Sequence, residues 1–278
     1  MTGYWEQVRA NGHAVPADRP LQELTAELTS MLGDPDPRRR DAIAYPTLVK
    51  WVSGGVYDDL LQGLGDGMAA GLGIGLGENG TDTVFRRSFS ALVLSSCIAR
   101  DNLHHLVPGE SILRWGDRVA SWFVRERDLR GFVPGRGWAH AVAHGADAIG
   151  ELARSKAIGQ PELAVLLDVI CDRLIAPTEY QLVHGEADRM ALATLTILRR
   201  DLIEIDVLEP WVSRLADHAP PAGAESADPY LVNGNVQSFL RALHLQLALT
   251  ASPPVCRSDL LLVVIEHLRQ ANSSVLGG

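Results

Sequence analysis

Cysteine is scarce in this sequence, whose 278 residues include only Cys97, Cys171 and Cys256. The three cysteines are far apart and form no CxxC pair, so their spacing indicates neither a disulfide framework nor a zinc finger. Sparse, unpaired cysteines are typical of a reducing compartment. We therefore predict a cytoplasmic protein that needs no structural metal in order to fold.

Long apolar runs are also missing. No stretch reaches the roughly 20 uninterrupted apolar residues that a membrane-spanning helix needs; residues 84–99, for example, are interrupted by Arg86, Arg87 and several serines. The first residues, MTGYWEQVRANGHAV, lack the apolar region of a signal peptide. We predict that the protein has no membrane partner.

A basic surface is missing as well. The chain has 25 Lys and Arg against 34 Asp and Glu, a formal net charge of −9. Nucleic acid as a main partner requires a basic face that neutralises phosphates, so we predict no nucleic-acid partner. The cluster Arg38-Arg39-Arg40 is short, and we interpret it as solvated helix surface.

Strict alternation of apolar and polar residues, the mark of half-buried strands, is not evident either. Helix signals recur instead: Leu21, Leu24 and Leu28 have helical spacing, Asp36-Pro37 is typical of a helix start, and Thr81 or Asp82 is a further capping residue. More helices are predicted over 110–127, 137–154, 161–176, 186–200, 207–217, 230–250 and 258–270. We predict an all-α fold of about eleven helices with essentially no sheet.

The predicted helices fall into consecutive pairs. The pairs begin roughly 35–55 residues apart, a spacing that overlaps the ~40–47 residues of HEAT-type pairs. Each pair has too little apolar face to stand alone, so stacking must bury it. We predict one all-helical domain over residues 1–278, built as a HEAT-like α-α superhelical stack of about five helical pairs. A weak surface linker is expected at 219–229, where Pro, Gly and Ser gather.

A glycine-rich stretch, GLGDGMAAGLGIGLGENG at 63–80, contains a formal G-x-G-x-x-G at Gly75, Gly77 and Gly80. Dinucleotide binding through this motif needs a strand just before it and an acidic residue about 20 positions later. No strand pattern precedes the glycines, and arginine, phenylalanine and serine follow them. We interpret the stretch as a loosely wound helix that ends in a turn, and we predict no bound cofactor.

The segment GRGWAHAVAHGADAIGEL at 135–152 is the most informative part of the chain. On one continuous helix, at 100° per residue, His140, His144 and Asp147 share a narrow stripe. Val142 and Ile149 fall on the opposite face. The pattern predicts an amphipathic helix whose polar stripe carries two imidazoles.

Three interpretations of this stripe are open. Two histidines four apart can bind a metal, but Ala141 stands where H-E-x-x-H enzymes carry glutamate, and spacing fixes no third ligand. Alternatively, His140 or His144 acts as acid, base or ligand anchor in a polar pocket, oriented by Asp147. In the third interpretation the histidines are structural and bond to backbone and neighbours. Spacing does not decide among them.

A second string, HGEADR at 184–189, predicts the start of another helix. Glu186 lies in its first turn and is spaced for an i,i+3 pair with Arg189. Arg136 and Trp138 precede the histidines and could supply an anion clamp and an apolar lid. We expect Glu186 or Arg189, together with Arg136, to approach the two histidines and close a polar cavity with Trp138 at its edge.

Three strings, TDTVFRRSFSALVLSSCIARDN, ERDLRGFVPGRGWAHAVAHGADAIGEL and HGEADRMA, together resemble a bacterial family, the domain of unknown function 2785, over about 41–200. The resemblance implies an all-helical, HEAT-like protein with no established reaction. The positions that match the family's recurring residues are Arg87, Ser88, Asp101, Arg136, Trp138, His140, His144, Asp147, Glu186 and Arg189.

Taken together, these patterns favour a protein that binds a small molecule in a His/Asp/Arg/Glu pocket, with an enzyme of hydrolase, lyase or cyclase type as one form of that function. The expected catalytic residues are His140, His144 and Asp147. The expected ligand-binding residues are Arg87, Arg136, Trp138, Glu186 and Arg189. The alternative is a HEAT-like scaffold that holds a protein partner on a concave surface and uses the histidines structurally.

Overall fold

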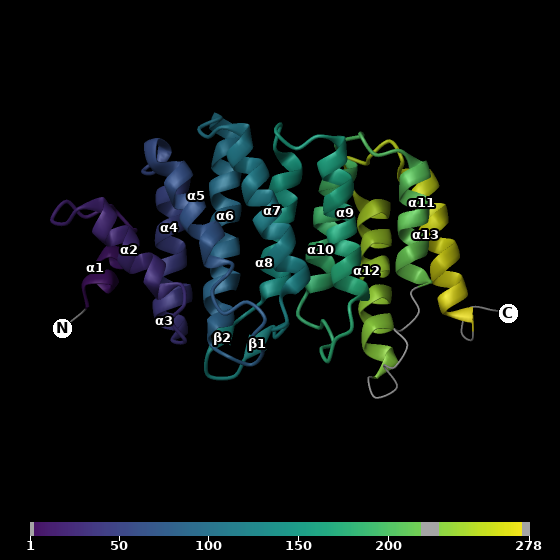
Figure 1. The fold of residues 1–278 in the computed structure, drawn as a ribbon, viewed down its shortest axis with the longest axis horizontal. Coiled ribbons are helices and arrows are strands. Elements are labelled where there is room, and N and C mark those ends of the chain that lie inside the picture. Colours follow the sequence, from purple (N-terminus) through teal and green to yellow (C-terminus); the bar gives the residue numbers. More distant parts are fainter. Residues whose placement is uncertain (1–2, 218–227, 274–278) are drawn as a thin grey trace. The chain divides into compact units, whose positions relative to one another are not determined.

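The computed structural model describes residues 3–217 and 228–273, which are mainly α-helical apart from one short hairpin (Figure 1). The all-α prediction is thus confirmed. The chain divides into two compact units, Met1–Ala148 and Ile149–Gly278, and each unit is described by itself. The single domain and the superhelical stack therefore stay predictions, and most of the linker predicted at 219–229 lies outside the described residues.

The first unit is a set of helices that pack side by side (Figure 1). In chain order they are α1 (Tyr4–Ala10), α2 (Leu21–Met31), α3 (Pro37–Arg39), the π-helix η1 (Arg40–Ala44), α4 (Tyr45–Ser53), the 3-10 helix η2 (Asp58–Leu60), α5 (Leu61–Gly71), α6 (Thr83–His104), α7 (Gly109–Arg125) and the first part of α8 (Ala141–Arg154). The long helix α6 packs against α4 and α5, and α5 also packs against α7.

Local sequence explains where these helices begin. The Asp36 side chain accepts a hydrogen bond from the Arg38 backbone N–H at 2.9 Å. Pro37 lies in the first turn of α3, where a backbone N–H would have no partner within the helix. Asp82 precedes α6, but its side chain makes no capping hydrogen bond and pairs instead with Arg136. The core of the unit is built from large side chains that are almost fully buried, among them Trp51, Phe85 and Trp122.

The second unit contains the rest of α8 followed by α9 (Gln160–Ile175), α10 (Glu186–Leu198), α11 (Ile205–Ala216), α12 (Pro229–Leu249) and α13 (Arg257–Ala271). Alternate helices contact each other: α9 packs against α11, α11 against α13, and α10 against α12. Contacts of this kind are typical of stacked helical pairs. No helix of the described residues combines the length and hydropathy that crossing a membrane requires.

The prediction of one helix over 137–154 is wrong at its start. Phe132–Val133 (β1) and Gly137–Trp138 (β2) form an antiparallel hairpin in which Phe132 pairs with Trp138. The helix α8 begins only at Ala141. Gly135 and Gly137, with φ of +74° and +79°, allow the tight turn that the helical pattern did not reveal.

Candidate functional site

His140 lies at the junction between the hairpin and α8. Its backbone N–H donates to the Arg130 carbonyl at 3.0 Å, and its carbonyl accepts from the His144 N–H at 3.0 Å. Its φ is +54°, a left-handed conformation that is rare for a residue other than glycine. Among the described residues, His13, His105 and Asp201 share this conformation, but each follows a helix, where left-handed caps are common. His140 instead precedes one.

The predicted polar stripe is therefore wrong in its geometry. His140 is not on the helix, and His144 is only 6% exposed. Every residue from 141 to 146 is buried, so the first turns of α8 have no solvent-facing side. Gly145, for example, lets Phe123 and Trp122 of α7 approach α8 closely, which a helical wheel of polar and apolar residues cannot show.

Aromatic rings connect His140 to the surface and to the core. The Trp138 ring stacks on the His140 ring, with centroids 4.7 Å apart and planes at 23°, and Phe132 packs edge-on against Trp138 at 5.1 Å. Trp138 is 41% exposed and Phe132 49% exposed. Inward, the His140 and His144 rings meet at 5.7 Å. A continuous row of rings thus leads from solvent to a buried imidazole.

Ser88 on α6 fixes the buried end of this row. Its hydroxyl donates to the Ala139 carbonyl, and its oxygen lies 2.7 Å from His144 Nδ1. A hydroxyl has one proton, so Ser88 accepts a hydrogen bond from Nδ1–H of His144. In the neutral ring, Nε2 then carries the lone pair. Ser88 is fully buried, so it orients the imidazole and is not placed as a nucleophile.

Beneath the hairpin lies Arg40, which the sequence pattern did not reveal. The cluster 38–40 was interpreted as solvated surface; that is correct for Arg38 and Arg39, which are exposed, but wrong for Arg40, which is fully buried. Its guanidinium lies 4.0 Å from the Phe85 ring and 5.0 Å from the Phe89 ring. No spacing rule distinguishes the third arginine of the run, because the two phenylalanines that hold it belong to α6.

Arg40 donates hydrogen bonds to three other residues of the first unit. It donates to the Arg136 carbonyl in the hairpin turn at 2.6 Å, to the Asp34 carbonyl at 2.7 Å and to the Asp41 carboxylate at 2.7 Å. Burial raises the pKa of Asp41, although the neighbouring Arg40 cation lowers it. A π-helical turn such as η1 is common at functional sites. These contacts place a buried cation against the turn of the hairpin.

The structure brings the other predicted residues of the first unit to different places. Arg136 is exposed and forms an ion pair with Asp82, so its guanidinium already faces a carboxylate. Asp147 is half-buried on α8, three residues after His144. Trp138 forms the outer edge of the ring row. Histidines and Trp138 therefore come together, whereas Arg136 is directed to the start of α6.

Arg87, an expected ligand-binding residue, lies in the core of the first unit. It is fully buried and forms a two-point ion pair with Glu126, at 2.6 and 2.8 Å. The same guanidinium donates to the carbonyls of Ile74 and Gly75 at 2.9 and 2.8 Å, so it holds the glycine-rich turn after α5. Within the described residues the helix α5, and no strand, precedes this turn, as the sequence pattern indicated.

Glu186 and Arg189 lie at the start of α10 in the second unit, which begins where the HGEADR string predicted. Glu186 is 1% exposed, and its carboxylate accepts from the His184 backbone N–H at 2.7 Å. The expected approach of Glu186 or Arg189 to the two histidines stays a prediction, since each unit is described by itself.

The chemistry that this arrangement offers is stacking, hydrogen bonding and proton transfer by imidazole. Among the residues that the structure describes, no three His, Cys, Asp or Glu side chains are grouped so as to hold a metal ion. An exposed tryptophan gives a flat apolar face, and the adjacent imidazole has ring nitrogens that donate or accept a hydrogen bond.

The comparisons with known proteins identify the family of this chain. The family model described as "Protein of unknown function (DUF2785)" matches residues 72–245, more than half of the chain, and the chain belongs to this family. The match begins and ends later than the segment 41–200 over which the resemblance was noted. It includes every predicted site residue. No curated protein and no solved structure matches the chain.

Proposed function

We propose that this member of the DUF2785 family binds a small organic molecule on the surface formed by Trp138 and His140. The observation that carries the proposal is the row of rings from exposed Trp138 through His140 to buried His144. The Trp138 ring offers a flat face to an apolar or planar group. The His140 imidazole beside it supplies a hydrogen bond that orients the molecule.

The conformation of His140 supports a role beyond packing. A left-handed backbone costs free energy for a residue with a side chain, and such strained residues gather at functional sites. At this position the strain aligns the imidazole with Trp138 and directs the chain into α8 at the same time. A plain structural junction would be served equally well by glycine.

We extend the proposal to proton transfer on the bound molecule, which makes the protein an enzyme of hydrolase, lyase or cyclase type. His140 is the residue that contacts the molecule, and His144 is its buried neighbour. Ser88 is a positioning residue, because it fixes which His144 nitrogen carries the proton. Asp147 is the proposed orienting carboxylate, while Arg136, Glu186 and Arg189 remain proposed ligand contacts and Arg87 acts through the turn that it holds.

A thermal-shift screen of small organic molecules against the purified chain tests the proposal. We expect at least one compound with a planar group to raise the melting temperature of the parent protein. That shift is expected to disappear in His140→Ala and to shrink in Trp138→Ala. The matched control is His104→Ala, which removes an exposed histidine at the end of α6 and keeps the full shift.

Two results would contradict the proposal. One is a compound whose shift is the same in the parent and in both site variants. The other is a broad screen that yields no shift at all, the result that the scaffold alternative predicts. Folding of each variant is checked by circular dichroism, so that a lost shift is not mistaken for a lost fold.

A further inference from the structure

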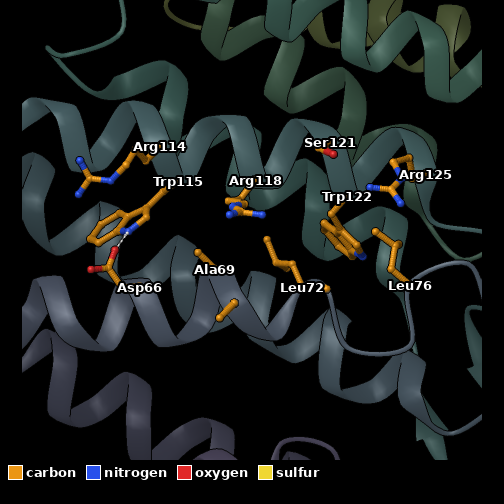
Figure 2. Close-up of a pocket in the computed structure, with 12 residues that line it drawn as sticks. Asp66, Ala69, Leu72, Leu76, Arg114, Trp115, Arg118, Ser121, Trp122 and Arg125 are labelled. Carbon is orange, nitrogen blue, oxygen red and sulfur yellow. Dashed lines mark hydrogen bonds between the residues drawn. The ribbon is translucent and has the colours of Figure 1, made fainter.

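A groove between α5 and α7 lies apart from the histidines and has a different chemistry. Its volume is about 620 Å³, within the range of sites that hold compact ligands. One wall is formed by α7, which contributes Arg114, Arg118 and Arg125, and the opposite wall is formed by α5 and the turn after it (Figure 2). The α5 wall is mostly small and apolar, with Ala69 and Ala70 among its residues.

The arginines form a row because of their spacing. Arg114, Arg118 and Arg125, with Ser121 between the last two, fall within about 60° of each other on a helix with 100° per residue. Figure 2 shows the three guanidinium groups distributed from one end of the groove to the other. At 1.5 Å of rise per residue, Arg118 is about 6 Å from Arg114 along the axis and about 10 Å from Arg125.

The charge of this row is largely uncompensated. Among the described residues, neither the Arg118 nor the Arg125 guanidinium forms an ion pair or a hydrogen bond, and both side chains are exposed. The Arg114 guanidinium donates to the Ser111 hydroxyl at 2.8 Å. Asp66 is the acidic residue of the groove, and one of its oxygens accepts from the Trp115 indole at 2.8 Å.

The shape of the groove sets what can occupy it. Trp115 and Trp122 are both 1% exposed, so neither ring face is available to stack on a nucleobase. A single phosphate would reach only part of a row about 16 Å long. An extended peptide advances about 3.3 Å per residue, so about six residues span the whole row. Their main chain would lie along the small apolar wall.

We propose that the groove binds a short acidic peptide segment of a partner protein in an extended conformation. Carboxylates of the segment pair with Arg114, Arg118 and Arg125, which present planar donors that suit carboxylate oxygens. This assigns a second binding function to the first unit, independent of the small-molecule site at His140.

Fluorescence anisotropy with a labelled six-residue oligoglutamate tests the proposal on the full chain, with a six-residue oligoglutamine as the uncharged control. We expect binding of oligoglutamate only, and weakening as salt is raised, because exposed ion pairs are screened. Arg118→Gln and Arg125→Gln should each weaken binding about fivefold, as expected for the loss of an exposed ion pair. Ser121→Glu places a carboxylate inside the row and should abolish binding.

Arg127→Gln is the matched control, since Arg127 is exposed two residues after Arg125 but does not line the groove. It should leave the affinity unchanged. The proposal is overturned if oligoglutamate does not bind, if Arg127→Gln weakens binding as much as Arg118→Gln, or if Ser121→Glu has no effect. It is also overturned if an oligothymidylate, inorganic phosphate or phosphatidylserine vesicles bind at the groove more tightly than oligoglutamate.

Discussion

Ser88 and His144, which belong to different helices and are 56 residues apart in the chain, are joined by a buried contact of 2.7 Å between Oγ and Nδ1. Because the Ser88 proton is directed to the Ala139 carbonyl, the contact makes His144 Nδ1 the donor. The bond to the Ala139 carbonyl also links α6 to the junction that precedes α8. A single hydroxyl therefore sets both the protonated nitrogen of the inner histidine and the path of the chain that carries the outer one.

Replacing Ser88 by alanine is expected to release both constraints. The Ala139 carbonyl and His144 Nδ1 lose a buried partner, which should lower the free energy of unfolding by about 1–3 kcal/mol. Nitrogen NMR of the imidazole should show the Nδ1–H tautomer in the parent protein and a mixture in the variant. Ser90→Ala is the control on the same helix, because the buried Ser90 hydroxyl has no hydrogen-bond partner among the described residues; it should be close to neutral. A parent protein with the Nε2–H tautomer would contradict this account.

Gly145 is expected to resist substitution although it lies inside a helix. Alanine is favoured over glycine by about 1 kcal/mol in a helix interior. A Cβ at Gly145, however, would lie 2.6 Å from Phe123 Cε2 and 3.1 Å from Trp122 Cζ3, which are packed in the core. Overpacking of this kind costs about 1–3 kcal/mol, so Gly145→Ala should lower the unfolding free energy in denaturant titration.

Gly150→Ala is the matched control for that substitution. Gly150 is on the same helix, and its added Cβ would meet Ala193 at an ordinary 3.8–3.9 Å. We expect this variant to be neutral or more stable by up to about 1 kcal/mol. Equal effects of the two substitutions would show that packing against Phe123 does not decide the outcome at Gly145.

Most of the helices after α1 were predictable because their sequences have local signals. Asp36-Pro37, Asp82 and the HGEADR string lie where α3, α6 and α10 begin, although only Asp36 makes a capping hydrogen bond with its side chain. The hairpin before α8 was not predicted, because two-residue strands are too short to show alternation. Because the hairpin leaves His140 before the start of α8, the predicted stripe of His140, His144 and Asp147 does not lie on one helix.

The sequence identified several residues of the candidate site but not how these residues are arranged. The histidines and Trp138 lie together because they are close in sequence. Arg40 and Ser88 join them through contacts between elements 51 to 96 residues apart, as in the bonds of Ser88 to Ala139 and of Arg40 to Arg136. Periodicity describes one helix at a time, so it cannot identify a buried cation that rests on the phenylalanines of another.

His13 should make the protein less stable in mild acid. Its Nδ1 lies 2.8 Å from the buried Thr47 hydroxyl, and burial, followed by the charges of Lys50 and Arg9, lowers the pKa of His13 below its ordinary 6.5. The folded state thus binds a proton less readily than the unfolded chain. Its contribution is present above pH 6.5 and is lost as the pH falls through the folded pKa.

The measurement is the melting temperature between pH 7.5 and 5 in the parent and in His13→Gln. The variant should lose less stability over this range, because its side chain does not titrate. His104→Gln, at the exposed end of α6, is the control and should follow the parent. A parent and a His13→Gln variant with parallel profiles would contradict the prediction.

Breaking the ion pair between Arg87 and Glu126 should lower the free energy of unfolding far more than breaking an exposed ion pair. Both side chains are almost fully buried, and Glu126 also accepts from the Trp122 indole at 2.8 Å. Removing one partner leaves a buried charge uncompensated, which costs about 3–5 kcal/mol. Glu126→Gln keeps the shape of the side chain and removes the charge, so the loss of unfolding free energy should fall in this range.

Hydrogen exchange distinguishes a local role from a global one. Because Arg87 also holds the carbonyls of Ile74 and Gly75, amides of the turn at 72–80 should exchange faster in Glu126→Gln than in the parent. The control is Arg154→Ala, which removes an exposed pair with Glu151 at 3.5 Å and should cost less than about 1 kcal/mol. If Glu126→Gln were as mild as the control, or left exchange of the turn unchanged, the Arg87 guanidinium would not be the group that fixes the glycine-rich turn.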